Sequence, residues 1–316
     1  MGGKGRLRED IGAEMVDDVI RRILTFGRDV VQFQVVQPLA ARSQIPRLAM
    51  RSRTENSRVT GEPNNPVVSL TTYGARLRTV HHTIESIAQG SVRPSRLILW
   101  VNEPRILEDP GAHLRRLRNR GLEIRLAADY GPHTKYFPYA ASAEPHSNHP
   151  LVTADDDIIY APYWLRGLRD NYDRRQELIH CWRARTITLN DSGIMPYAEW
   201  LPCSTTTATN LAFSTGVSGV IYPPRMLIAI REYGTEFMDR SQNADDVWLN
   251  WIALRSGIRV RQVRPRPKHF ASLRTTQRVR LSKANVDRGR NDRYVANVYT
   301  SSDIESLLAA RESLAW

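Results

Sequence analysis

The chain has few cysteines and no long apolar run. Cys181 and Cys203 are its only cysteines and form no Cys-x-x-Cys pair, which argues against a thiolate zinc site and against a disulfide framework. No run of about eighteen apolar residues is present, so we expect no membrane-spanning helix. The polar, basic residues 1–8 are not followed by the apolar segment of a signal peptide. We therefore expect a cytoplasmic protein.

Acidic residues are in the minority. The 316 residues include 45 Lys and Arg against 33 Asp and Glu, a net charge of +12, whereas the 41% hydrophobic and 25% charged fractions are ordinary for a folded protein. Thirteen basic residues lie from Arg255 to Arg293, where only Asp287 and Asp292 oppose them. Such a stretch attracts polyanions or phosphate-bearing molecules, or it forms a solvated basic surface.

The first 65 residues differ from the rest of the chain. Between residues 9 and 24, apolar side chains recur at helical spacing on one stripe: Met15, Val16, Val19, Ile20, Ile23 and Leu24. This predicts a helix that packs on the main domain or on a second copy of the chain. Arg21, Arg22 and Arg28 beside the stripe would also suit a peripheral membrane contact. Residues 42–65 are polar and contain Pro46 and Pro63, and we interpret them as a linker.

Strands and helices alternate after residue 66. The hydrophobic pattern predicts strands at residues 66–72, 96–101, 122–127 and 151–154, with helices at 79–89 and 110–120. This alternation is typical of an α/β fold with a Rossmann-type, mostly parallel central sheet flanked by helices. Ligands bind such sheets beyond the carboxyl ends of the strands, where this sequence has Thr71–Tyr73 and Asp155–Asp157.

The second half of the chain mixes helices and short strands. The predicted elements are helices at 162–172 and 244–256, strands at 178–185 and 258–263, and a short helix at 303–312. We therefore divide the chain into a helical N-terminal extension and linker (1–65), a main α/β domain (66–270), and a basic C-terminal segment with a short helix (271–316).

Three consecutive carboxylates, Asp155, Asp156 and Asp157, follow the strand at 151–154. Their mutual repulsion must be offset, either by water around a solvated acidic turn or by a divalent cation at a cleft. Carboxylate oxygens suit Mg²⁺ or Mn²⁺, and the preceding apolar strand favours the cation. Because side chains two residues apart in an extended segment point the same way, Asp155 and Asp157 would face one pocket, and Asp156 would either face away or contact the ligand.

A second acidic pair, Asp245 and Asp246, lies at the predicted start of a helix. In one interpretation, Asn243 and the two acids only cap that helix, since the helix dipole favours acidic residues there. Alternatively, one carboxylate is a general base aimed at the cleft. Upstream, Gly216 and Gly219 would allow close backbone approach to a ligand, or mark a turn.

Three segments resemble a known family, the bacterial family-2-type glycosyltransferases with the GT-A fold. Residues 67–76 (VVSLTTYGAR) are similar to the family's nucleotide-binding first strand. Residues 153–165 (TADDDIIYAPYWL) resemble its Asp-x-Asp metal motif and the following helix, and residues 245–249 (DDVWL) resemble its acidic pair. The resemblance extends from Val67 to His269, and it has Asp245 where the family usually has Glu.

The resemblance implies an enzyme that moves a sugar, with inversion, from a nucleoside-diphosphate sugar, expected to be a UDP-sugar, to a hydroxyl of a carbohydrate or glycolipid acceptor. Asp246 takes the position of the base, with Asp245 beside it. Mn²⁺ or Mg²⁺ is expected as cofactor. Its implied ligands are Asp155, Asp157 and His269. The implied nucleotide-sugar contacts are Thr71, Tyr73, Arg76, Lys135, Asp155, Asp156 and Gly219. Trp200, Trp248 and Tyr222 would stack on sugars or fill the core.

Two other functions share some of these features. A sugar nucleotidyltransferase would use the same fold and metal, but it typically needs a glycine-rich loop after the first strand, where this sequence has one glycine, Gly74. A non-enzymatic polyanion-binding module would use the basic stretch alone and would not need two acidic clusters. We expect no nucleic-acid partner. The sequence leaves open whether the protein forms a homo-oligomer.

Overall fold

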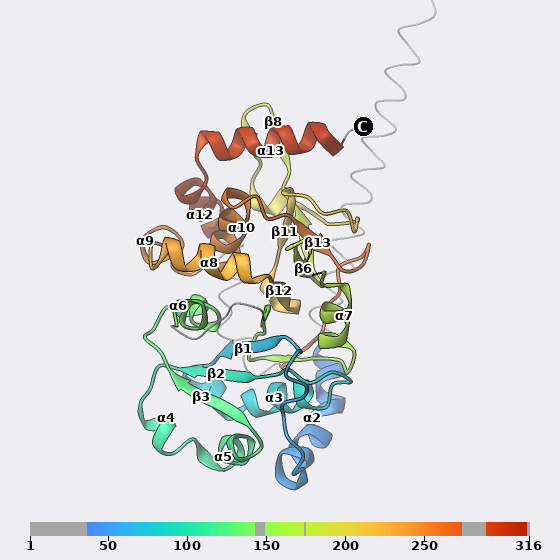
Figure 1. Ribbon diagram of the computed structural model, residues 1–316, viewed down its shortest axis with the longest axis vertical. Helices are drawn as coiled ribbons and strands as arrows, with labels where there is room; N and C mark the ends of the chain where they lie inside the picture. Colours follow the sequence, from blue (N-terminus) through green and yellow to red (C-terminus); the bar gives the residue numbers. More distant parts are fainter. Residues whose placement is uncertain (1–36, 143–148, 174, 274–288, 315–316) are drawn as a thin grey trace, which may run out of the picture.

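The computed structural model describes residues 37–142, 149–173, 175–273 and 289–314. Its centre is a seven-stranded sheet with the order β13-β6-β12-β4-β1-β2-β3 (Figure 1). The strands are β1 (Val67–Thr71), β2 (Leu97–Val101), β3 (Leu122–Leu126), β4 (Leu151–Thr153), β6 (Ile179–Cys181), β12 (Val220–Tyr222) and β13 (Val260–Gln262).

Most neighbouring strands in this sheet are parallel. β1 pairs in parallel with β2 and β4, β2 with β3, and β6 with β13. β12 is antiparallel to both of its neighbours, β4 and β6. The predicted α/β class with a mostly parallel central sheet is therefore confirmed, with one reversed strand inserted next to β4.

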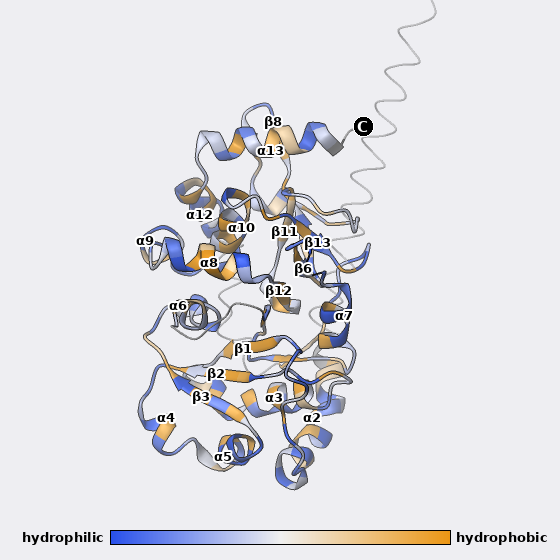
Figure 2. Cartoon of the chain, in the orientation of Figure 1, coloured by the Kyte–Doolittle hydropathy of each residue, from blue (hydrophilic) through white to orange (hydrophobic). Residues whose placement is uncertain are grey.

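Side chains of the central strands alternate between two cores. In β2, for example, Leu97, Leu99 and Val101 belong to one apolar cluster, and Ile98 and Trp100 belong to the other. Successive side chains of a strand point to opposite faces, so a sheet covered on both sides has strands that are apolar throughout. In Figure 2, hydrophobic colour predominates along β1 and β2.

Helices cover both faces of the sheet. The first core includes side chains of α3 (Val80–Ala88), α5 (Gly111–Asn119) and α7 (Trp164–Asn171). The second includes side chains of α6 (Phe137–Ala141), α8 (Pro224–Tyr233) and α10 (Asp245–Arg255). Short helices α4 (Arg105–Glu108) and α9 (Phe237–Arg240) lie in the connections. The observed bounds of three helices and four strands agree with the predicted ones to within one or two residues: α3, α5, α10, β1, β2, β3 and β4.

The interpretation of residues 42–65 as a linker is wrong for its first part, because α2 spans Gln37–Thr54. Ala41 and Leu48 of this helix are buried in a small cluster with Ile159 and Ala271. Among the side chains described at residues 39–54, only Ala41 and Leu48 are apolar and fully buried, and Pro46 lies inside the helix, so the helical pattern is weak. The helix predicted at residues 9–24 lies outside the described residues.

The single strand predicted at residues 178–185 is two strands in two sheets. β6 ends at Cys181, and β7 (Ala184–Thr186) lies in a three-stranded sheet between β10 (Leu201–Pro202) and β11 (Ala212–Ser214). The chain changes sheet at Trp182, whose backbone N–H donates to the Gly219 carbonyl and whose ring packs against Gly167. Two further pairs of short strands are β8 (Leu189–Asn190) with β9 (Gly193–Ile194), and β5 (Ile158–Ile159) with β14 (Ala271–Ser272).

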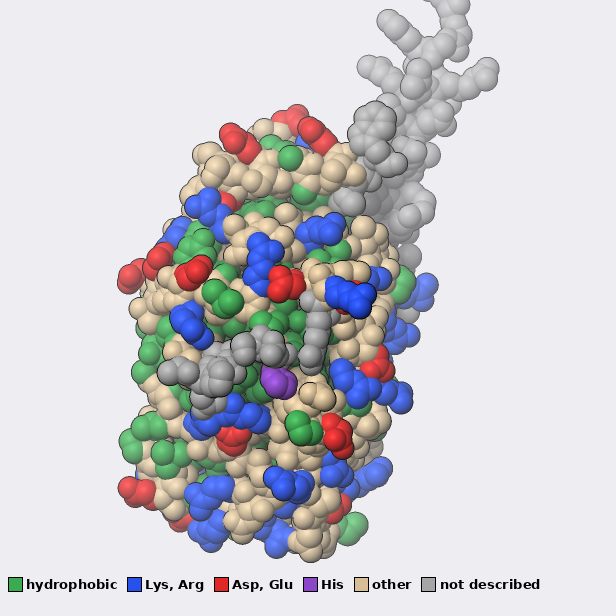
Figure 3. All heavy atoms as spheres, viewed as in Figure 1, with side chains coloured by type: hydrophobic (Ala, Val, Ile, Leu, Met, Phe, Trp, Pro, Cys, Tyr) green, Lys and Arg blue, Asp and Glu red, His purple; other side chains and the backbone are tan. Residues whose placement is uncertain are grey.

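The C-terminal segment is more helical than predicted. It contains α12 (Arg290–Val298), and the short helix predicted at 303–312 is the longer α13 (Ser301–Leu314). Asp303 accepts hydrogen bonds from the backbone N–H and hydroxyl of Thr300, which closes the first turn of α13. Basic and acidic side chains are interspersed on the face shown in Figure 3. Within the described ranges, no helix is long and apolar enough to cross a membrane.

Candidate active site

A pocket of about 590 Å³ lies beyond the carboxyl ends of β1 and β4. Its wall includes Thr71 and Thr72 from the end of β1, and the triplet Asp155–Asp157 that follows β4. The opposite wall comes from β7, the turn Gly216–Ser218 and the start of α10. The first and second acidic clusters, 90 residues apart in sequence, therefore line the same pocket.

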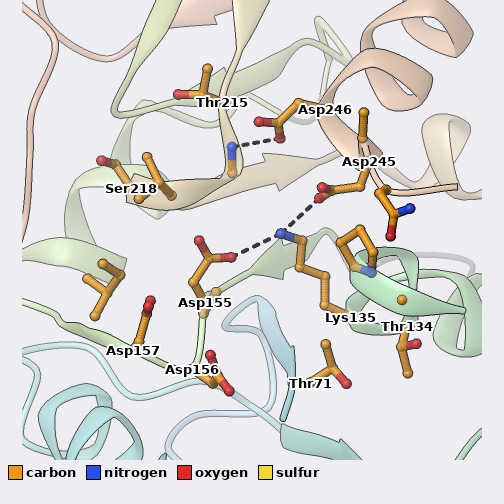
Figure 4. A pocket seen from close by; sticks show the side chains of 18 of the residues that line it. Thr71, Thr134, Lys135, Asp155, Asp156, Asp157, Thr215, Ser218, Asp245 and Asp246 are labelled. Carbon is orange, nitrogen blue, oxygen red and sulfur yellow. Dashed lines mark hydrogen bonds and ion pairs between the residues drawn. The ribbon is translucent and has the colours of Figure 1, made fainter. Parts of the chain in front are cut away.

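The three aspartates alternate in direction. In Figure 4, Asp155 and Asp157 point into the pocket, whereas Asp156 points toward the end of β1. Thr72 Oγ1 donates to Asp156 Oδ2 at 2.7 Å, and Arg76 Nη1 lies 2.6 Å from Asp156 Oδ1. Burial raises the pKa of Asp156, and Arg76 opposes that increase. Asp156 thus fixes the triplet to the first strand, as a structural anchor at the base of the pocket.

Arg76 belongs to the short helix Gly74–Arg78, which follows β1. Besides its bond to Asp156, its Nη2 lies 3.8 Å from Asp157 Oδ2, and its guanidinium lies 5.4 Å from the centre of the Tyr73 ring. Burial would lower the pKa of Arg76, but Asp156 and Asp157 raise it. Thr71, Tyr73 and Arg76, predicted to contact the nucleotide, all line the pocket.

Lys135 joins the two acidic clusters. Its Nζ lies 3.0 Å from Asp155 Oδ1 and 2.8 Å from Asp245 Oδ2, as the dashed lines in Figure 4 show. Burial alone would lower the pKa of Lys135, but Asp155, Asp245 and Asp246 raise it well above its ordinary value. Lys135, predicted to contact the nucleotide-sugar, lines the pocket and lies between two carboxylates, with its side chain only 9% exposed.

Asp246 faces the same space from the first turn of α10. Its Oδ1 accepts a hydrogen bond of 2.9 Å from the backbone N–H of Gly216. Burial and the neighbouring Asp245 raise the pKa of Asp246 to about 7, while Lys135 and the Gly216 N–H act in the opposite direction. Such a carboxylate can accept a proton near neutral pH. The N-cap residue of α10 is Ala244 rather than Asn243, and Asp245 and Asp246 lie in the first turn, where the helix dipole favours acidic residues.

The two glycines of the 216–219 turn have different roles. A Cβ on Gly216 would lie 3.1 Å from Lys135 Nζ and 3.2 Å from Asp246 Oδ1, so this position keeps the backbone close to the acidic pair. Gly219 is absent from the pocket wall, contrary to its predicted nucleotide contact. With φ at +92°, a Cβ there would lie 2.5 Å from Trp164 Nε1, so Gly219 makes room for a core tryptophan.

His269 lines the pocket on the side of β7. Burial, with Arg183, Lys268 and Arg185, lowers its pKa to about 3, so the imidazole is neutral. Among the described residues, no group of three or more His, Cys, Asp or Glu side chains is arranged to hold a metal ion. The structure therefore does not assemble the predicted ligands Asp155, Asp157 and His269 into a closed metal site.

The three aromatic residues considered for sugar stacking are core residues instead. Trp200, Trp248 and Tyr222 are at most 2% exposed, and none of them is part of the pocket wall. The aromatic side chains that do line the pocket are Tyr73, Tyr197, Phe213 and Phe270.

Several pocket residues had no sequence motif. Arg183 and Arg185 lie on or beside β7, and Thr215 and Ser218 flank Gly216. The spacing of Arg183 and Arg185, which puts both on one side of a strand, was the available signal for the arginines. The prediction of a single strand over residues 178–185 obscures that signal.

Comparison with known proteins finds no matching family model and no curated protein of similar sequence. The chemistry of the pocket therefore has to be judged from its own residues. It combines two inward-facing carboxylates at a strand end, a carboxylate with a pKa near neutrality, and a wall of arginines. This arrangement can bind a phosphate-bearing ligand with a cation and can remove a proton from a second ligand.

Proposed function

We propose that this protein is a metal-dependent glycosyltransferase that moves a sugar from a nucleoside-diphosphate sugar to a hydroxyl acceptor. The observation that supports this best is the Lys135 bridge. Its ammonium group contacts both Asp155, which follows β4, and Asp245, which belongs to the acidic pair on α10. Donor activation and deprotonation of the acceptor need two such groups across a single pocket.

The size of the pocket suits a nucleotide-sugar. Small-molecule sites commonly have volumes of roughly 300–1,000 Å³, and this one has about 590 Å³. Its place beyond the carboxyl ends of parallel strands is where ligands bind in open α/β sheets. The mostly parallel sheet flanked by helices is compatible with a Rossmann-like fold, and we propose that it is a GT-A fold of the bacterial family-2 type.

Mg²⁺ or Mn²⁺ fits Asp155 and Asp157. Both are hard oxygen donors that point into the pocket, and Mg²⁺ is usually held by one or two carboxylates together with substrate phosphates and water. A site completed by the donor diphosphate needs no third protein ligand, which agrees with the open arrangement found here. When bound, the cation would offset negative charge on the departing diphosphate.

In the proposed reaction, Asp246 takes the proton from the acceptor hydroxyl, whose oxygen attacks the anomeric carbon of the donor sugar. The bond from that carbon to the diphosphate oxygen breaks, and the nucleoside diphosphate leaves with the bonding electrons. One direct displacement of this kind inverts the anomeric configuration. The Gly216 N–H holds the Asp246 carboxylate in place. Lys135 pairs with Asp245 and Asp155, so its positive charge offsets their repulsion of the Asp246 carboxylate. Thr71 and Tyr73 border the donor side, and Arg76 positions Asp156 and Asp157.

We further propose a UDP-sugar as donor, a carbohydrate or glycolipid as acceptor, and a location in the cytoplasm or at the inner membrane surface. A thermal-shift screen of nucleotide-sugars with and without Mn²⁺ tests the donor class. A ligand at about 100 times its Kd stabilises the native state by about 2.7 kcal/mol, which raises the unfolding temperature measurably. If no nucleoside diphosphate or nucleotide-sugar raises it in the presence of Mn²⁺, the proposed function is wrong.

A further inference from the structure

Helix α2 has apolar side chains on two opposite faces. The inward face shows the spacing of a packed helix and comprises Ala41, Ile45, Leu48 and Ser52. The outward face carries Leu39, Pro46 and Met50, whose spacing of seven and four residues puts them on one stripe. Leu39 is 55% exposed and Met50 is 62% exposed. Two large apolar side chains on this stripe therefore meet solvent.

Arginines flank the outward stripe. Because a helix has about 3.6 residues per turn, Arg42 and Arg53 lie on one side of the stripe and Arg47 lies on the other. All three are exposed. α2 contains no Asp or Glu, and the ion pairs that it makes with described carboxylates involve Arg51 alone. The outward face of α2 is thus apolar at its centre and basic at both margins.

This pattern is typical of a helix that lies on an anionic membrane surface. The apolar side chains of such a helix enter the boundary between headgroups and acyl chains, while Arg and Lys at the margins contact lipid phosphates. A second copy of the same face is a poor partner, since the arginines would repel one another. An anionic lipid surface matches both the apolar stripe and the charge beside it.

α2 lies at the edge of the molecule (Figure 1), close to the candidate active site. Its inward face packs on Ile159 and Ala271, which are register partners in the small sheet of β5 and β14. The next pair in that sheet, Ile158 and Ser272, lines the pocket. A protein docked through α2 therefore has one helix and one two-stranded sheet between the lipid surface and this part of the pocket.

We propose that the outward face of α2 docks the protein on an anionic phospholipid surface. Leu39 and Met50 enter the lipid, and the flanking arginines contact its phosphates: Arg42, Arg47 and Arg53. The inference goes beyond glycosyl transfer and does not depend on it, because no described residue of α2 lines the pocket.

Flotation of the full chain with vesicles tests the proposal. The wild-type protein is mixed with vesicles of phosphatidylcholine alone, or of two thirds phosphatidylcholine and one third phosphatidylglycerol. We expect binding to the anionic vesicles only, and weaker binding as salt is added, because salt screens the charges. Leu39→Glu and Met50→Glu, tested singly, should each weaken this binding about tenfold, since a carboxylate replaces the inserted side chain.

Charge variants and matched controls locate the contact. Arg42→Gln and Arg47→Gln leave the apolar stripe unchanged, and binding should fall about fivefold for each arginine removed. Ile228→Glu on α8 is the control for the glutamate variants, because Ile228 is 55% exposed, as Leu39 is. Arg166→Gln, at an exposed position of α7, is the control for the arginine variants. Both controls should bind as the wild type does, and urea unfolding verifies that every variant is folded.

Each outcome decides the question. Absence of binding to the anionic vesicles, equal binding to both kinds of vesicle, or unchanged binding in the α2 variants overturns the proposal. A loss seen only in Arg21→Gln and Arg22→Gln would assign the contact to residues 9–24 instead. A wild-type dimer that Met50→Glu converts to a monomer, with vesicle binding unchanged, would assign the outward face of α2 to a second copy. UDP binding with Mn²⁺ tests the proposed function separately.

Discussion

Replacing Lys135 with methionine tests the junction between the two acidic clusters. Methionine has a similar length and no charge, so the change removes the ammonium group that lies 3.0 Å from Asp155 Oδ1 and 2.8 Å from Asp245 Oδ2. It leaves Asp155, Asp245 and Asp246 around one pocket without the cation between them. We expect the folded state to be destabilised at neutral and alkaline pH.

The size of the effect follows from burial. Removing one partner of a buried ion pair typically costs about 3–5 kcal/mol, because the other charge stays buried and unpaired. The side chains of Asp155 and Asp245 are 27% and 13% exposed, so water compensates in part. We therefore expect a loss of about 2–3 kcal/mol in the free energy of unfolding.

The loss should depend on pH in a defined direction. In the wild type, the pKa of Asp246 is raised to about 7 from an ordinary value of 3.8, so this group lowers stability progressively as pH rises from about 4 to about 7. Lys135 lowers that pKa, so in Lys135→Met it rises further and the decline extends above pH 7. The difference between variant and wild type should be larger at pH 8.5 than at pH 5.5.

Urea unfolding at these two pH values measures the effect. Lys268→Met is a matched control, since the ammonium group of Lys268 lies 5.9 Å from the centre of the Phe270 ring rather than between carboxylates. Its unfolding free energy should change by less than about 0.5 kcal/mol. Equal stability of Lys135→Met and wild type at pH 8.5 would refute the reasoning, because the lysine would then not be the group that offsets the acidic clusters.

Other predictions concern the base and the turn that faces it. In Asp246→Asn the amide oxygen can still accept the Gly216 N–H, so donor binding should persist while transfer falls by about 10²–10⁴-fold. The wild-type kcat/KM should rise with pH through about 7, a limb that Asp246→Asn abolishes in a pH–rate profile; wild-type turnover in this variant would exclude Asp246 as the base. Gly216→Ala puts a Cβ 3.1 Å from Lys135 Nζ and should reduce transfer at least tenfold. Its control, Gly234→Ala, has a positive φ but nothing within 4 Å, so it should cost about 1 kcal/mol of stability and leave the transfer rate unchanged.

The sequence predicts the sheet well because its strands have a simple pattern. β1, β2 and β4 are buried on both faces, and a continuous apolar run followed by polar residues marks both the strand and its carboxyl end. The alternation of Asp155, Asp156 and Asp157 follows from the same extended geometry. These features depend on neighbours in sequence, so local reasoning reaches them.

The errors lie where distant contacts decide. α2 has a weak apolar stripe and is placed by α3, α5 and β14 rather than by its own pattern. The chain leaves the central sheet at Trp182 because that ring packs against Gly167, which no local signal indicates. Gly219 looks like a ligand-binding glycine in sequence, but Trp164 is the residue that requires it.

The candidate site likewise combines residues that the sequence indicates with residues that only distant contacts bring into place. The two acidic clusters are visible in the sequence, but the lysine between them is not, because Lys135 reaches both only through the tertiary fold. Its contact with the nucleotide-sugar stays a prediction. Arg183 and Arg185, which line the pocket, are likewise missed because the predicted strand at residues 178–185 has the wrong boundary.

The most direct measurement of the proposed function is a calorimetric titration of UDP into the wild-type protein and Asp157→Ala, each with and without Mn²⁺. The account predicts that the wild type binds UDP with Mn²⁺ and much more weakly without it, and that Asp157→Ala loses this metal dependence. Binding to Asp157→Ala that equals the wild type, or wild-type binding that does not change when Mn²⁺ is removed, would contradict the proposal that the carboxylates after β4 hold a cation against the donor diphosphate.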